Sequence, residues 1–295
     1  MCCSVTPGQT VRFSETTLYA AEVLHQDRVA HVLGYQNRAE ILAEPPARSL
    51  LQRISDALRG ASHVPNAMLL PFPAEPRSMT ASNVVDTSRI PRVLQDLALA
   101  VRPPTPQAKG ISRSLALAPA SVQVFEAAGI YTVVLAEDAR EIPGALGAVR
   151  PERRPPLNAA LFDAYARWYP GWTMALCCFN NTEAALALPL VWWYRPARPE
   201  ALFLPGLDAH TGDLPDLGAT VETDHTLAVS SHALTKGQQV YYRDPLPPEG
   251  PRWFLPRALG GVFEGSALNG DWYCDTERLR AGTLELRRDP PRAQA

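Results

Sequence analysis

The sequence has few lysines, little net charge and no glycine-rich phosphate-binding motif. Only Lys109 and Lys236 are lysines, although lysine and arginine together number 28 against 30 aspartates and glutamates. The formal net charge of −2 is too small to create a field that would hold nucleic-acid phosphates. No glycine-rich loop precedes either lysine, and no Gly-x-Ser-x-Gly elbow occurs. We therefore expect no nucleic-acid partner, and the common signals of nucleotide-binding proteins and serine hydrolases are missing.

Long hydrophobic runs are missing as well. No apolar stretch reaches the roughly 18 residues that a transmembrane helix needs. The first residues contain neither the basic nor the hydrophobic region of a secretory signal. We therefore expect a cytoplasmic protein without a transmembrane segment.

The five cysteines are few, odd in number and partly adjacent, at Cys2-Cys3, Cys177-Cys178 and Cys274. Adjacent cysteines bridge each other only through a strained ring, so reduced thiols are expected instead of a disulfide scaffold. Neither pair has the two-residue spacer that is usual for zinc ligands. The sequence predicts no metal site and no cofactor.

Proline, by contrast, is abundant, with 29 residues that gather in connections between patterned segments. Because proline lacks a backbone donor, it punctuates strands and helices. Apolar residues at helical spacing predict helices at 47–59, 92–101 and 156–168. Strands are predicted at 9–13, 17–23, 28–37, 66–73, 121–125, 130–136, 172–179, 188–194, 201–204, 226–230, 239–242 and 283–287.

The predicted strands outnumber the helices and do not alternate with them one for one. This order favours an α+β fold with layered, mainly antiparallel sheets and three or four helices. We expect a single globular domain over residues 1–288, with an internal loop or linker at the proline-rich 143–156. Residues 289–295 are expected to form a disordered tail.

The second residue is the first candidate for chemistry. Removal of Met1 would leave Cys2 with a free α-amino group beside its own thiol. One residue would then supply both nucleophile and base, because the thiolate is the reactive form of cysteine. The alternatives are an ordinary cysteine in a frayed terminus and acylation of Cys2-Cys3.

The Met1-Cys2 start followed by predicted strands resembles the N-terminal nucleophile (Ntn) hydrolases, a superfamily that includes acylases and glutamine amidotransferases. The resemblance implies an αββα sandwich, amide-bond hydrolysis and Cys2 as the nucleophile. Cysteine-type acylases carry an arginine and an acid soon after the opening turn. Here Glu22 has no arginine beside it in the sequence, and Arg12 is the nearest one upstream.

Further polar residues are candidates for the same site. Asn66 and Asn180 stand next to apolar strands, where an amide could stabilise an oxyanion. Arg12, Asp208 and His210 are candidates for substrate binding, since a histidine next to carboxylates is suited to acid–base chemistry. Turn formation or backbone capping would equally explain the two asparagines, and a plain turn or metal ligation would explain Asp208 and His210.

Aromatic residues cluster at 165–172 and at 192–194. We expect most of them to pack in the core and some to wall a ligand pocket. The leading functional hypothesis is a cysteine-dependent amidohydrolase or acyltransferase of Ntn type that acts on a small amide substrate. The alternative is a non-enzymatic binding or scaffold protein whose aromatic, loop-rich surface takes an unknown protein partner, and whose N-terminal cysteines are incidental or acylated.

Overall fold

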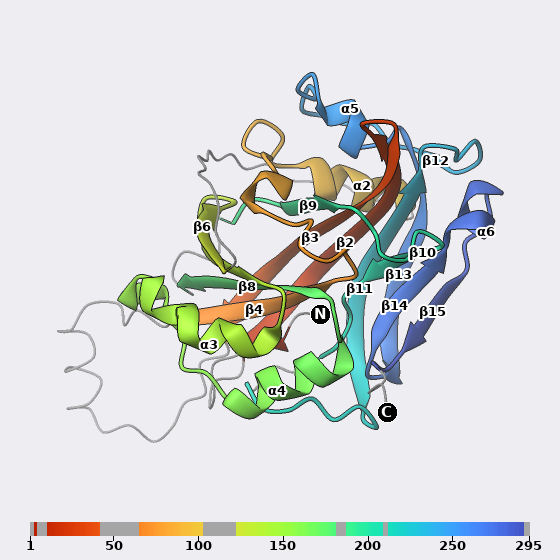
Figure 1. The fold of residues 1–295 in the computed structure, drawn as a ribbon. Coiled ribbons are helices and arrows are strands. Elements are labelled where there is room, and N and C mark those ends of the chain that lie inside the picture. Colours follow the sequence, from red (N-terminus) through yellow and green to blue (C-terminus); the bar gives the residue numbers. More distant parts are fainter. Residues whose placement is uncertain are drawn as a thin grey trace, which may run out of the picture.

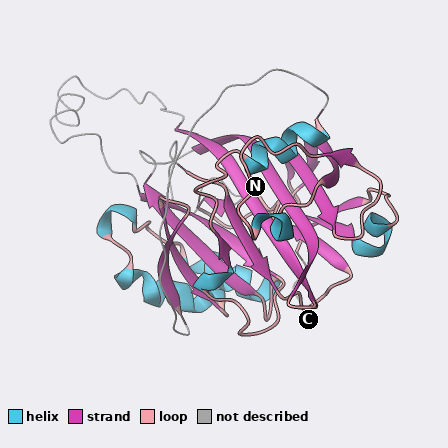
Figure 2. Ribbon diagram, turned by 90° about the horizontal axis from the view of Figure 1, so that it is seen from above, coloured by secondary structure: helices cyan, strands magenta, loops and turns pink. Residues whose placement is uncertain are grey.

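The computed structural model describes residues 3–4, 11–41, 65–102, 122–180, 187–208 and 212–291, of which 3–4, 11–15 and 38–41 are described by their backbone alone. Three β-sheets dominate this part of the chain, and short helices lie around them (Figures 1 and 2).

The largest sheet has seven strands in the order β12-β13-β11-β2-β3-β9-β5. Its centre is the long β2–β3 hairpin, which turns at Gln26 and Asp27, both with positive φ. All neighbours pair antiparallel except β11 and β2, which are parallel. The strands are β2 (Val11–His25), β3 (Arg28–Ile41), β5 (Val84–Val85), β9 (Leu190–Tyr194), β11 (Thr220–Ser231), β12 (Gln238–Gln239) and β13 (Arg257–Leu268).

Two smaller sheets are antiparallel throughout. A five-stranded sheet has the order β1-β4-β8-β7-β6, and a three-stranded sheet has the order β10-β14-β15. The five strands are β1 (Cys3–Ser4), β4 (Pro65–Phe72), β6 (Gln123–Ala127), β7 (Tyr131–Ala136) and β8 (Thr173–Asn180). The three are β10 (Ala201–Leu204), β14 (Asp271–Asp275) and β15 (Leu286–Asp289).

Alternation along the strands divides the core into three parts. Leu18 and Leu33 of the seven-stranded sheet share one apolar cluster with Met68 and Leu70 of the five-stranded sheet, so these two sheets face each other. Leu69 points the other way, into a cluster with the helices α3 and α4. The outer face of the seven-stranded sheet packs against α2 and α5. Helices α2 and α5 therefore lie on one outer face, helices α3 and α4 lie on the other, and the two larger sheets lie between them (Figure 1).

The helices are short. They are α2 (Val93–Val101), α3 (Ile142–Ala145), α4 (Ala159–Trp168), α5 (Gly250–Trp253) and α6 (Thr276–Arg280), with 3-10 turns η1 (Ala81–Asn83), η2 (Ala139–Glu141), η3 (Leu146–Ala148) and η4 (Pro151–Arg153). Within the described ranges, no helix is both long and apolar enough to cross a membrane.

The predicted fold class is confirmed in its coarse form, as a strand-rich mixture of strands and helices with mainly antiparallel pairing. The helices predicted at 92–101 and 156–168 correspond to α2 and α4, whereas the one at 47–59 lies outside the described residues. The third sheet and the short helices depart from a regular αββα sandwich. The strands β13 and β14 were not predicted. In β13 the strand pattern is obscured by glycines and many exposed residues.

The predicted start of the loop, residue 143, lies inside α3, and the predicted start of the tail, residue 289, lies inside β15. Residues 143–156 contain most of α3 together with η3 and η4, and Leu146 and Val149 are buried against the five-stranded sheet. Asp289 belongs to β15, and residues 292–295 lie outside the described part. The single domain over 1–288 stays a prediction.

A buried carboxylate ties the end of β2 to distant elements. The Glu22 side chain is fully buried and pairs with Arg280 of α6 through both carboxylate oxygens. The Ser231 hydroxyl donates to Glu22 Oε1 at 2.9 Å, and His232 Nδ1 lies 3.2 Å from the same oxygen. His31 stands opposite Glu22 on β3, and burial lowers its pKa to about 4, so it is neutral. The arginine that the sequence lacks beside Glu22 thus comes from the other end of the chain.

We expect Glu22→Ala to lower the free energy of unfolding by about 3 kcal/mol, because a carboxylate removed from a buried pair leaves the opposite charge uncompensated. This value is at the low end of the range for breaking a buried ion pair, because Arg280 is partly exposed and water can reach it. Urea denaturation of the variant checks this. Glu75→Ala is the control, because the Glu75–Arg28 pair is exposed and should contribute less than about 1 kcal/mol. Equal losses in the two variants would contradict the interpretation.

Two adjacent glycines in β13 have different roles. Gly260 has φ +158°, and a Cβ placed there would lie 2.0 Å from the carbonyl oxygen of Leu227 on β11. A Cβ on Gly261 would meet no atom within 4 Å. The close approach of β11 and β13 therefore requires glycine at the first position alone.

Gly260→Ala should destabilise the protein by about 3 kcal/mol or more, because neither backbone can move aside without breaking the ladder. Gly261→Ala should leave the free energy of unfolding within about 1 kcal/mol of the wild-type value. Thermal unfolding of both variants, one residue apart in the same strand, is the comparison. A tolerated alanine at 260 would show that β11 and β13 do not approach this closely.

Candidate functional site

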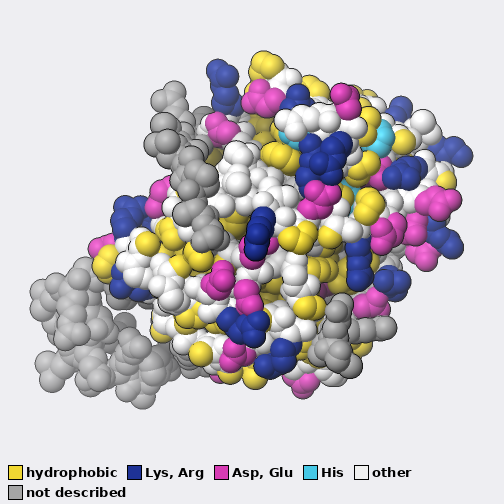
Figure 3. All heavy atoms as spheres, viewed as in Figure 1, with side chains coloured by type: hydrophobic (Ala, Val, Ile, Leu, Met, Phe, Trp, Pro, Cys, Tyr) yellow, Lys and Arg dark blue, Asp and Glu magenta, His cyan; other side chains and the backbone are white. Residues whose placement is uncertain are grey.

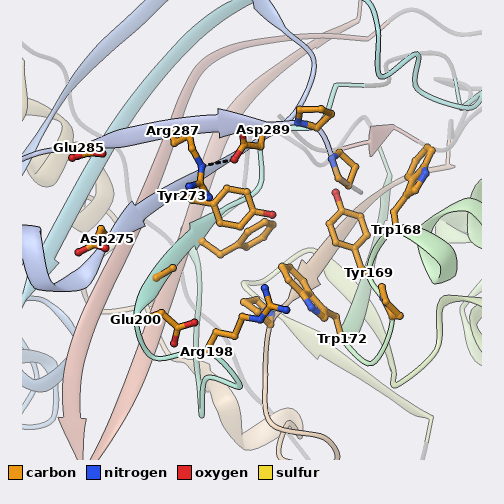
Figure 4. A pocket seen from close by; sticks show the side chains of 16 residues that line it. Trp168, Tyr169, Trp172, Arg198, Glu200, Tyr273, Asp275, Glu285, Arg287 and Asp289 are labelled. Atoms are coloured by element: carbon orange, nitrogen blue, oxygen red, sulfur yellow. Dashed lines mark ion pairs between the residues drawn. The ribbon is translucent and has the colours of Figure 1, made fainter. Parts of the chain in front are cut away.

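A cavity of about 820 Å³ lies over the outer face of the three-stranded sheet (Figure 4). We call it the outer-sheet groove. Its walls come from the sheet, from the turn between α4 and β8, and from the segment that precedes β10. The lining residues are Pro73, Trp168, Tyr169, Pro170, Trp172, Arg198, Glu200, Ala201, Phe203, Tyr273, Asp275, Glu285, Arg287, Asp289, Pro290 and Pro291.

Strand alternation determines which side chains face the groove. Leu202 and Leu204 of β10 and Cys274 of β14 belong to the core shared by the sheets. Their neighbours Phe203 and Tyr273 point to the opposite face and line the groove. Each of the three strands therefore contributes one set of alternating residues to the core and the other set to the groove.

An aromatic row crosses this face. Phe203 and Tyr273 are paired in register, and their rings meet edge to face with centroids 5.6 Å apart. Trp172 stands perpendicular to Phe203 at 5.0 Å, and the Arg287 guanidinium lies over the Tyr273 ring at 5.7 Å. The row joins the turn before β8 to β10, β14 and β15, so these rings hold one another in fixed orientations.

The second wall is formed by the last residue of α4 and the turn that follows it. The Trp168, Tyr169 and Trp172 rings succeed one another along it, with Tyr169 and Trp172 at 5.2 Å. The Tyr165 ring packs against both Trp168 and Tyr169 at 5.8 and 5.3 Å. The amphipathic helix α4 buries Tyr165 in the core and so presents the following turn to the groove.

A single carboxylate fastens this wall to the sheet. Asp271 is fully buried at the start of β14 and accepts the Tyr169 hydroxyl at 2.6 Å through Oδ2. Its Oδ1 accepts the backbone N–H groups of Gly206 and Leu207 at 2.8 and 3.1 Å. Burial raises the pKa of Asp271 above its ordinary value, although these three donors favour the ionised form.

The residues predicted to stabilise an oxyanion do not converge. Asn66 lies on the face of β4 that carries Met68 and Leu70, between the two larger sheets, and its Oδ1 accepts the N–H of Ala67. Asn180 lies on the opposite face of the same sheet, where its Nδ2 donates to the carbonyl of Glu152 in η4. Two amides on opposite faces of a sheet cannot donate to one oxygen atom.

The remaining predicted residues are only partly described. Cys2 and His210 lie outside the described residues, and Arg12 lies in β2 with only its backbone described. Asp208 follows β10, where its N–H donates to Asn269 Oδ1 and its carbonyl accepts Asn269 Nδ2. These bonds hold Asp208 in the connection to β11.

Cys177, Cys178 and Cys274 are buried, so none of these three offers an alternative nucleophile at the surface. Burial raises the pKa of the Cys178 and Cys274 thiols to about 12, so both are protonated at neutral pH. Within the described ranges, no group of three or more His, Cys, Asp or Glu side chains is placed to hold a metal ion.

The sequence predicted only some of the residues that line the outer-sheet groove. The aromatic cluster at 165–172 was expected to wall a pocket in part, and Trp168, Tyr169 and Trp172 do line one. Phe203, Tyr273 and Arg198 were missed. The alternation of Trp272, Tyr273 and Cys274 is a strand signal that would have placed Tyr273 opposite the core.

Comparison with known proteins gives few matches. No family model and no curated protein matches the chain. Among solved structures, the chain is similar to a mutated baculovirus P35 after caspase cleavage, with a TM-score of 0.41 and 11% identity over 94% of this chain and 100% of that one. It is also similar to P35 in a complex of caspase-8 and P35, with a TM-score of 0.39 and 11% identity over 94% of this chain and 96% of that one.

The prediction of a cysteine-dependent amidohydrolase or acyltransferase is wrong. The two similar structures given above are both of P35, in one case in a complex with caspase-8. The divergence of Asn66 and Asn180 gives a physical reason, because the assigned oxyanion donors do not meet.

Tyr169→Phe should lower the free energy of unfolding at neutral pH by about 1–3 kcal/mol, since Asp271 would lose a donor inside the protein. The raised pKa of Asp271 means that its stability contribution is present at acidic pH and is lost as pH rises through the folded-state pKa. Removing the Tyr169 hydroxyl raises the pKa of Asp271 further, because the ionised carboxylate loses a donor. The stability lost in Tyr169→Phe should therefore be smaller in mildly acidic buffer, where Asp271 is more often protonated.

Chemical denaturation at neutral and mildly acidic pH measures this deficit. Tyr242→Phe is the matched control, because the Tyr242 hydroxyl donates to the carbonyl of Leu255, which does not titrate. A Tyr169→Phe deficit that is the same at both pH values would show that Asp271 is not the group affected.

Proposed function

We propose that the chain is a non-enzymatic binding protein that takes a segment of a protein partner in the outer-sheet groove. The observation that carries the proposal is the row of Trp172, Phe203 and Tyr273, held rigid by mutual ring contacts and flanked by arginines. Tryptophan, tyrosine and arginine are the residues that contribute most of the binding energy in protein interfaces.

The rigidity of the groove supports the same reading. Tyr169 is fixed by Asp271, and the Tyr273 ring meets Phe203 edge to face while the Arg287 guanidinium lies over it. Side chains that are already ordered lose little conformational entropy when a partner covers them. A preformed aromatic surface of this kind is suited to binding without rearrangement.

The chemistry of the lining favours binding over catalysis. None of the described lining residues is Cys, Ser, Thr or His, and the lining carboxylates Asp275, Glu285 and Asp289 are already engaged with Arg278 or Arg287. On the face that Figure 3 shows, basic and acidic side chains are interspersed. The cytoplasmic location expected from the sequence stays a prediction.

Selection of random linear peptides on the immobilised full-length protein tests this function. We expect enriched peptides whose affinity falls at least about tenfold in Trp172→Ala and in Tyr273→Ala, the loss typical of an interface hot spot. Isothermal titration calorimetry with a synthetic enriched peptide measures the affinity.

Tyr241→Ala is the matched control, because Tyr241 is an aromatic residue 79% exposed outside the groove. It should leave the affinity unchanged. The proposal fails if no peptide is enriched, or if enriched peptides bind both groove variants as well as they bind the wild type. Thermal unfolding of each variant shows whether a lost affinity reflects a lost fold.

A further inference from the structure

Most charges that line the outer-sheet groove are already neutralised by neighbours. Arg287 pairs with Asp289, as Figure 4 marks. Glu285 pairs with Arg278 at 2.6 Å. The Asp275 carboxylate accepts the backbone N–H of Arg278 at 2.9 Å and so caps helix α6.

Arg198 is different. Its guanidinium makes neither a hydrogen bond nor an ion pair with any residue in the described part of the chain. Figure 4 shows it beside Trp172, at the aromatic end of the groove, while Glu200, Asp275 and Glu285 lie on the side away from Trp172. An unpaired cation therefore stands next to the rings that form the binding surface.

The backbone that carries Arg198 is fastened on both sides. Before it, the N–H of Ala197 donates to the carbonyl of Pro73 at 2.9 Å. After it, the Thr276 hydroxyl donates to the carbonyl of Pro199 at 3.1 Å, and the Thr276 N–H donates to that of Glu200 at 3.0 Å. Arg198 is thus presented from a fixed position, and not from a free loop.

A planar guanidinium beside aromatic rings is suited to a carboxylate, which it can bind through two parallel N–H donors. We infer that Arg198 selects the occupant of the outer-sheet groove, an extended segment of a partner protein that places an Asp or Glu side chain against this guanidinium. The inference rests on the proposed function of the groove and adds the chemistry of its partner.

The position of Arg198 relative to the aromatic row also fixes where the side chains of that segment lie. An apolar or aromatic side chain would lie on Phe203 and Tyr273, and the acidic side chain would lie towards Trp172 and Arg198.

Parallel peptide selections on the wild type, Arg198→Ala and Arg198→Glu test the inference. Peptides enriched on the wild type should carry Asp or Glu at one position beside an aromatic or aliphatic anchor. Arg198→Ala should lose this bias and bind the wild-type peptide about tenfold more weakly. Arg198→Glu should enrich Lys or Arg at the same position. Arg89→Ala, at an exposed arginine before α2, is the control and should change neither bias nor affinity.

The outcomes separate the inference from the proposed function. If enriched peptides need Trp172 and Tyr273 but show no acidic preference, or bind Arg198→Ala unchanged, the role of Arg198 is overturned while the groove remains a binding site.

If C-terminal amidation abolishes binding, the carboxylate comes from a chain end and the side-chain assignment is overturned. If the wild type sediments as a dimer that Tyr273→Ala dissociates, the occupant is a second copy of this chain. If no peptide depends on the groove aromatics, both ideas fail.

Discussion

The bonds of Asp271 are the constraint on which the groove depends. One buried carboxylate accepts the hydroxyl of Tyr169 and the backbone N–H groups of Gly206 and Leu207. It therefore joins the turn after α4, the segment that follows β10 and the start of β14. A buried carboxylate without donors would be costly, so these three segments are held in one arrangement. The aromatic wall and the sheet face meet because this arrangement is fixed.

The same principle operates elsewhere in the fold. Glu22 gathers Arg280, Ser231 and His232 around one buried carboxylate, and so joins β2, β11 and α6. At α2, Arg92 pairs with Asp244 and Asp96 pairs with Arg243, which fastens the helix to the segment after β12. In each case a charged group inside the protein is stable only with its partners in place, so distant parts of the chain are held in register.

The groove is a consequence of strand geometry combined with these anchors. Alternation sends Leu202 and Cys274 to the core and Phe203 and Tyr273 to the other face. The outward rings would be isolated on an open sheet, but the turn after α4 stands over them. Ring contacts then run from Trp172 to Arg287, and the unpaired Arg198 sits beside them. The proposed function therefore rests on this surface and not on the cysteine at the N-terminus.

The sequence by itself determined the strand-rich class, the antiparallel pairing and the helices α2 and α4, because apolar periodicity and proline positions are local signals. It also located the aromatic turn at 165–172. Only the tertiary structure decided that Asn66 and Asn180 lie on opposite faces, that Glu22 meets Arg280, and that Tyr273 stands beside Phe203. Those facts depend on which strands pair and in what register, and pairing between residues far apart in the chain is not encoded in any local pattern.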